Sequence, residues 1–397
     1  MVRRLAGLLA LFLSTNACSP GPASNAGIYA ECVRLDGQEK FACINERLLP
    51  VARTGEVQSA LEMLANLADT DSDVMREGHL FAHSIGIASF DPTRDFASAF
   101  LRCSALFQAG CYHGLIQASL AGATEVGAET INALCASVLA AGADRWTHFQ
   151  CLHGMGHGLL IQNNYDLLKA LDACELMNDP AGRVFCHGGA FMENAMRAAH
   201  PGHSALTAAL GGHASHGDQM PAFPATDPDD PHYPCSIVKV HQKSPCYGIQ
   251  TAVILHLNGY DFGAAADTCE GAPEWLRALC HQSLGRDVSG IANRDPKKMN
   301  RLCGMDRTPN ARHCYAGAAK SVIDWRGDVE EGLAFCRTVR DRAGRARCSH
   351  ALGQQAVMLV SGQDRRRELC ARAGGDYRDA CLWGAGLIEA APPILEE

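Results

Sequence analysis

The chain has 397 residues, of which 47% are hydrophobic and 20% are charged, and this balance excludes a largely disordered protein. Its formal net charge of −8 argues against general nucleic-acid binding. Aromatic residues make up only 6% of the chain whereas glycine occurs 39 times, which favours close-packed helices over a β-sandwich. The 19 cysteines are unexpected, because a chain of this length can bury a large core without disulfides.

The N-terminus predicts export. Arg3 and Arg4 precede an apolar run over residues 5–13, which is too short to span a bilayer and is typical of a signal peptide. The segment that ends in Cys18 resembles the lipobox of bacterial lipoproteins. That resemblance implies removal of residues 1–17, acylation of Cys18, attachment to the periplasmic face of the outer membrane, and a tether over residues 18–27. Ordinary cleavage at the same bond is the alternative, and it would yield a soluble periplasmic or secreted protein.

The other 18 cysteines form nine successive pairs along the chain. The second cysteines of the last five pairs are spaced by 34, 34, 34 and 33 residues, a period typical of helix–turn–helix repeats. The simplest disulfide pattern joins the two cysteines of each pair, and thereby the two helices of one hairpin. The pairs are Cys32/Cys43, Cys103/Cys111, Cys135/Cys151, Cys174/Cys186, Cys235/Cys246, Cys269/Cys280, Cys303/Cys314, Cys336/Cys348 and Cys370/Cys381.

A tenth hairpin without cysteines is predicted between two of these pairs. Cys43 and Cys111 are 68 residues apart, which is two periods, and the position of the missing second cysteine falls at Glu77. The predicted fold is an all-α, right-handed α-solenoid of about ten 34-residue hairpins, nine of them with a local disulfide. This architecture resembles the tetratricopeptide and Sel1-like solenoids, in particular the cysteine-rich Sel1-like proteins of bacteria.

The repeats are interrupted once. We expect N-terminal repeats over residues 28–197, an insertion loop over 198–234 and C-terminal repeats over 235–397. A loop of this length inside a solenoid is unusual, and it predicts a mobile surface insertion, a lid or a cation-binding segment. Its histidines are His200, His203, His213, His216 and His232.

Aligning the repeats on the second cysteine places polar side chains in register. The helices that follow Glu77, Cys111 and Cys151 carry histidine two residues later, and histidine or glutamine six residues later. Residues i and i+4 of a helix share one face, about 6 Å apart at Cβ, which is a common way to direct two imidazoles at one metal ion. The residues in this register are His79, His113 and His153, followed by His83, Gln117 and His157.

The following repeat adds His187 and Glu193. We therefore predict a transition-metal site for Zn, Cu or Fe, holding one ion or two, because imidazole-rich ligation suits these metals. Glu193 is the candidate catalytic acid or base if the site performs chemistry. The candidate metal ligands are His79, His83, His113, His153, His157 and His187.

Three glycines lie beside the last histidine pair, at Gly154, Gly156 and Gly158. Together they weaken a helix by about 3 kcal/mol relative to alanine, so they predict close approach of a ligand or of a neighbouring helix.

Two other functions remain open. The first is a non-catalytic scaffold that presents its concave surface to a protein partner, with the histidines packed inside and binding nothing. The second is a metal-dependent oxidoreductase or hydrolase, which requires an open coordination position and a pocket. A haem held by axial histidines also fits the pattern. Convergence of the imidazole nitrogens on a common point distinguishes a metal site from dispersed, individually hydrogen-bonded rings.

Overall fold

The computed structural model describes residues 29–121, 126–199 and 223–396. Within these ranges the regular structure is helical and contains no β-strand, which confirms the predicted all-α hairpin solenoid. No helix among the described residues is long and apolar enough to span a membrane. The predicted signal peptide, Cys18 and most of the insertion loop, with His200, His203, His213 and His216, lie outside the described residues.

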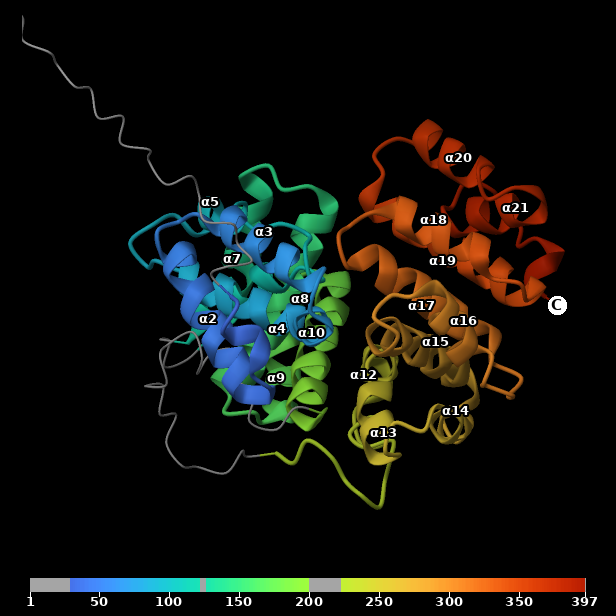
Figure 1. Ribbon diagram of the computed structural model, residues 1–397, viewed down its shortest axis with the longest axis horizontal. Helices are drawn as coiled ribbons and strands as arrows, with labels where there is room; N and C mark the ends of the chain where they lie inside the picture. Colours follow the sequence, from blue (N-terminus) through green and yellow to red (C-terminus); the bar gives the residue numbers. More distant parts are fainter. Residues whose placement is uncertain (1–28, 122–125, 200–222, 397) are drawn as a thin grey trace, which may run out of the picture.

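Two groups of helices make up the molecule (Figure 1). The first group begins with η1 (Cys32–Arg34) and continues with α2 (Gly37–Arg53), α3 (Val57–Ala68), α4 (Ser72–Ser89), α5 (Phe96–Phe100), α6 (Gly110–Leu120), α7 (Ala128–Ala140), α8 (Arg145–Gln162), α9 (Leu167–Cys174) and α10 (Pro180–Ala199). The second group consists of α12 (Val240–Tyr247), α13 (Thr251–Leu257), α14 (Phe262–Glu270), α15 (Glu274–Ile291), α16 (Pro296–Cys303), α17 (Arg312–Asp324), α18 (Val329–Thr338), α19 (Arg342–Leu359), α20 (Gln363–Ala371), α21 (Gly375–Gly384) and η2 (Pro393–Leu395).

All nine predicted disulfides are present, and each joins neighbouring cysteines of one hairpin. Every pair leaves its Cα atoms between 5.3 and 5.7 Å apart, well within the range that a disulfide allows. For loops of this length the chain-entropy model assigns about 3 kcal/mol of stabilisation to each bridge.

Aspartate side chains determine where many helices begin. Asp71 accepts hydrogen bonds from two backbone amides at the start of α4, and Asp144 accepts one from Thr147 at the start of α8. These caps satisfy amides that have no partner within the helix. The helix α6 begins differently, after three successive residues with left-handed backbone conformations, Phe107, Gln108 and Ala109. Such conformations are costly for residues other than glycine, so tertiary contacts must hold this turn.

The second helices of successive hairpins pack side by side, and glycines bring their backbones together. A Cβ atom added at Gly156, Gly285 or Gly353 would overlap the carbonyl of the second cysteine in the next hairpin. Each of these glycines lies five residues after its own second cysteine. The contact is reciprocal, because the neighbouring helix has a glycine three residues after its own cysteine. At Gly189, for example, a Cβ atom would overlap the His153 carbonyl.

This glycine register corrects the alignment of the hairpin without cysteines. Gly86 meets the Cys111 carbonyl in the same way, and counting back five residues places the missing cysteine at Phe81 rather than at Glu77. Phe81 is buried and stacks on Phe41 of α2 with ring centroids 4.4 Å apart, so the side chain at the cysteine position packs against the preceding hairpin. The correction makes His83 the counterpart of His113 and His153.

The two helix groups meet at the turn before α6. The Phe107 and Trp325 rings contact edge to face at 4.9 Å, and the Gln108 amide donates to the Trp325 carbonyl at 3.5 Å. The Gln108 side chain also donates to the Ser321 hydroxyl at 3.3 Å. These contacts with α17 and the residue after it hold the left-handed turn in place.

The packing role of the glycines is testable in the second helix group. A Cβ at Gly317 would overlap the Gln282 carbonyl, whereas a Cβ at Gly290 meets nothing within 4 Å. We expect Gly317→Ala to lower the free energy of unfolding by about 1–3 kcal/mol through overpacking. The control Gly290→Ala should raise it by up to about 1 kcal/mol, because alanine is the better helix former. Urea denaturation with disulfides intact measures both, and equal effects would contradict the packing role.

Candidate metal centre

Five of the six predicted histidine ligands gather in one cluster inside the first helix group. They project from α4, α6 and α8, which lie side by side, and Glu193 joins them from α10. Neighbouring ring centroids in the cluster are 4.6 to 5.5 Å apart. The members, hereafter the histidine cluster, are His79, His83, His113, His153 and His157.

His79 and His83 face each other across one turn of α4. The Nδ1–H of His79 donates to the Phe107 carbonyl at 2.8 Å, so Nε2 of His79 carries the lone pair. Nε2 of His83 lies 3.0 Å from that nitrogen, and the Gln117 amide lies 3.0 Å from Nδ1 of His83. The left-handed turn before α6 therefore orients His79 through the Phe107 carbonyl.

His113 lies at the centre of the cluster and has one nitrogen without a partner. Its Nε2 lies 3.1 Å from Oε1 of Gln150 and donates to it. Its Nδ1 is buried and makes no hydrogen bond. A buried lone pair without a donor is costly in a folded protein and calls for a bound ligand or ion.

His153 and His157 repeat the arrangement on α8. Nδ1 of His157 lies 2.8 Å from the Glu193 carboxylate, and His153 hydrogen-bonds the backbone of Phe185. The Nε2 atoms of the two rings face each other at 3.3 Å. Glu193 also accepts a hydrogen bond from Gln117 at 3.3 Å, which connects the α8 histidines to those of α4.

Burial keeps these imidazoles neutral. Removal from water lowers the pKa of His79 and of His153 to about 4, and lowers the pKa of His83, His113 and His157 well below the usual value. The neutral form is the one that binds metal ions. Burial also raises the pKa of Glu193 to about 7.

The nitrogens of the cluster converge closely enough to share an ion. Three groups of side chains place one potential ligand atom each within 4.8 Å of one another. The groups are His79, His83 and His113; His113, His153 and His157; and His83, His157 and Glu193. His113 belongs to the first two groups and lies between the two histidine pairs. This cluster could hold a metal ion.

His187 does not join the cluster. Its Nε2 lies 3.3 Å from the Glu175 carboxylate, and its ring faces His241 at 6.0 Å. His187 directly follows Cys186 and Glu175 directly follows Cys174, so this contact spans one hairpin beside its disulfide.

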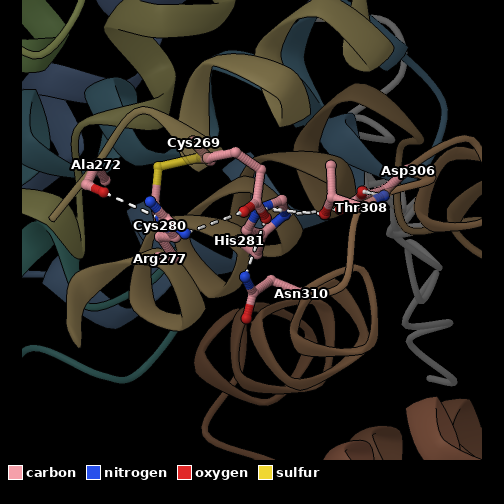
Figure 2. A network of polar contacts seen from close by, with 9 residues as sticks. Cys269, Ala272, Arg277, Cys280, His281, Asp306, Thr308 and Asn310 are labelled. Carbon is pink, nitrogen blue, oxygen red and sulfur yellow. Dashed lines mark hydrogen bonds and ion pairs between the residues drawn. A yellow bond between two sulfur atoms is a disulfide. The ribbon is translucent and has the colours of Figure 1, made fainter. Parts of the chain in front are cut away.

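A second hairpin repeats the contact of His187 without any cluster nearby. His281 follows Cys280 and lies 3.0 Å from Glu270, which follows Cys269. Figure 2 shows this network, in which the other nitrogen of His281 lies 2.7 Å from Asp306. Because the pattern recurs beside another disulfide, the position after the second cysteine has a structural role in both hairpins.

The three glycines of α8 approach neighbouring helices. Gly156 meets the backbone of α10, Gly154 lies against His113 and Ile116 of α6, and Gly158 lies against Leu120. Sequence reasoning missed Gln150 and the carbonyls of Phe107 and Phe185. No local pattern singles out Gln150, since its role depends on the ring of another helix.

Comparison with protein-family models, with curated proteins and with solved structures finds no match in any of the three. The resemblance to tetratricopeptide and Sel1-like proteins is therefore one of architecture. The geometry of the cluster is what supports a metal centre.

The depressed pKa values predict a pH-dependent stability for the metal-free protein. Below pH 6.5 the unfolded chain takes up protons on His79 and His153, whereas the folded chain does so only near pH 4. The free energy of unfolding should therefore fall as the pH falls through this window, by about 2 kcal/mol for each histidine between pH 7 and 4.5. Urea denaturation of the metal-free protein at both pH values measures the loss.

Replacing both residues by asparagine should remove the part of that dependence that His79 and His153 contribute, while His83, His113 and His157 keep theirs. His256→Asn, at an exposed side chain of α13, is the matched control. An unchanged pH dependence in His79→Asn/His153→Asn would contradict the assignment.

Proposed function

We propose that this protein binds a transition-metal ion in the histidine cluster. The observation that carries the proposal is the unpartnered, buried Nδ1 of His113, which lies between two pairs of imidazoles. A metal ion would satisfy that lone pair together with those of the neighbouring rings. His187 and His232 also have buried ring nitrogens without a hydrogen bond, so His113 is distinguished by its place between two pairs of imidazoles.

The partners around the cluster support metal binding. Metal-bound imidazoles usually donate their other nitrogen to a carbonyl or carboxylate, which fixes ring orientation. His79 donates to a backbone carbonyl, and His113 donates to the side-chain oxygen of Gln150. Nδ1 of His157 contacts the Glu193 carboxylate. At His83 the side-chain NH₂ of Gln117 contacts Nδ1, whereas Oε1 of Gln117 is buried and has no hydrogen-bond partner. Turning that amide would offer Nδ1 an acceptor and free Nε2 for the ion.

One tightly bound ion is the stoichiometry that this geometry favours. His113 offers a single free nitrogen, because its Nε2 is held by Gln150. An ion bound in either three-histidine group therefore removes the third imidazole from the other group. All 18 cysteines among the described residues form disulfides, so nitrogen ligation is expected, which suits Zn, Cu or Fe.

The disulfides are evidence for the compartment. Nine disulfides in one chain suggest an oxidising space outside the cytosol. We propose a periplasmic protein anchored to the outer membrane through Cys18. The evidence for the anchor is the lipobox-like sequence before that residue.

Chemistry at the cluster would make the protein an oxidoreductase or a hydrolase, with Glu193 as acid or base. The contacts of Glu193 support an orienting role toward His157. Its use in catalysis stays a prediction.

Metal content tests the proposed function. Protein purified without a histidine tag and loaded with Zn²⁺ or Cu²⁺ should retain about one ion per chain after gel filtration, because three buried imidazoles suffice for a stable site. His113→Ala, which removes a ligand from both three-histidine groups, should retain less than about a tenth of that amount, and Gln150→Leu should weaken affinity by about tenfold or more. Elemental analysis and competition with a chelator provide the readouts.

Two histidines outside the cluster are the controls. His256→Ala, on the exposed face of α13, and His187→Asn, beside a disulfide, should retain the wild-type amount of metal. Metal at background level in the wild type, or an unchanged content in the cluster variants, would overturn the proposal and favour the non-catalytic scaffold.

The membrane anchor is testable by itself. In a bacterium that processes lipoproteins, the mature protein should begin at Cys18 and carry the mass of the attached lipid, since stable anchoring requires acyl chains. Intact-mass spectrometry of the wild type and of Cys18→Ala measures this. An unmodified mature N-terminus in the wild type would contradict the anchor and indicate ordinary signal-peptide cleavage.

A further inference from the structure

A cavity of about 490 Å³ lies beside the histidine cluster, between the two helix groups. His79 is one of its lining residues, so the cavity reaches the α4 end of the cluster. Its walls come from α4 and α10 on one side and from α13, α15 and α17 on the other. Clefts between structural units are common places for small ligands, and this volume is within their usual range.

Apolar side chains dominate these walls. Leu80, Met192, Met196, Ile249, Leu255 and Ile291 line the cavity. The two methionines lie one turn apart on α10, and Met192 directly precedes Glu193. Methionine sulfur makes favourable contacts with aromatic rings and adapts to their shape. The walls therefore suit a flat, mainly apolar molecule.

The charged groups in the cavity are already paired. Arg286 donates to the Asp287 carboxylate at 2.7 Å and to the carbonyls of Gly248 and Ile249 at 3.3 Å. Asp287 also accepts from the Thr251 hydroxyl at 2.7 Å. Arg76 donates to Asp73 at 2.8 Å. A charged ligand would have to break these pairs, whereas an uncharged ligand would not.

We propose that this cavity binds an uncharged aromatic molecule of one or two rings that carries a phenolic oxygen, with the oxygen directed to His79 and the ion held there. The inference rests on the proposed metal site. Apolar walls accommodate the rings, and His79 is the member of the histidine cluster that lines the cavity, so an ion bound to Nε2 of His79 would be the partner of the oxygen. An ion held by three imidazoles has a further coordination position that an oxygen can fill.

2-Naphthol is a suitable probe, because it has two rings, one hydroxyl and no charge at neutral pH. We expect calorimetric titration of Zn²⁺-loaded wild-type protein to show one binding site for 2-naphthol. 2-Methoxynaphthalene, whose oxygen is a poor ligand, and 2-naphthoate, which is charged, should each bind about tenfold or more weakly. His79→Asn should reduce the affinity for 2-naphthol toward that of the methyl ether.

Filling the cavity separates this inference from the metal site. Met192→Trp and Ala252→Phe enlarge two half-buried residues that line the cavity and are absent from the histidine cluster. Each should weaken 2-naphthol binding by about tenfold or more while the Zn²⁺ content stays at the wild-type level. Leu139→Trp, at a side chain 50% exposed on α7, is the control and should bind like the wild type.

The two proposals fail in different measurements. No 2-naphthol binding to wild-type protein that holds Zn²⁺, or equal binding in both cavity-filling variants and the wild type, would overturn the ligand site alone. Equal affinity for 2-naphthol and its methyl ether would overturn the contact with the ion. A wild-type protein that holds neither Zn²⁺ nor Cu²⁺ would overturn the metal site, together with the part of this inference that depends on it.

Discussion

Backbone contact between neighbouring second helices is the constraint on which the rest of the structure depends. At Gly86, Gly156, Gly285 and Gly353 a carbonyl of the next helix occupies the space where a Cβ atom would be. Helices this close share a fixed register, since sliding by one residue would place a side chain against a carbonyl. The disulfides then fix each hairpin internally, while the glycines fix one hairpin against the next.

The histidine cluster follows from that register. His83, His113 and His153 are equivalent positions of three adjacent helices, so close packing brings their rings within about 5 Å centroid distance. Burying five imidazoles is unfavourable by itself, because each loses its hydration. Hydrogen bonds that the rings donate to the Phe107 carbonyl, Gln150 and Glu193 offset part of this cost. Nδ1 of His113 is left without a hydrogen-bond partner.

The second helix group completes the surroundings of the cluster. Trp325 and Ser321 hold the left-handed turn whose carbonyl orients His79. The same group supplies Arg286, Ile249 and Leu255 to the cavity beside His79. Hairpins far apart in sequence therefore determine the geometry of one imidazole and the character of the space next to it. A solenoid whose distant hairpins contact one another in this way can build a site that no single hairpin provides.

By itself the sequence determined the helical hairpins, all nine disulfides and five of the residues that meet in the cluster. Those features depend on short-range spacing, which repeats along the chain and can be counted. The 34-residue period did not determine the alignment of the hairpin without cysteines, because the spacing there departs from 34 residues. Only the contact at Gly86 placed Phe81 in the position of the cysteine. The tertiary structure also decided that His187 belongs to a hairpin contact with Glu175. It alone revealed Gln150, the Phe107 carbonyl and the cavity, because these depend on how side chains of different helices face one another.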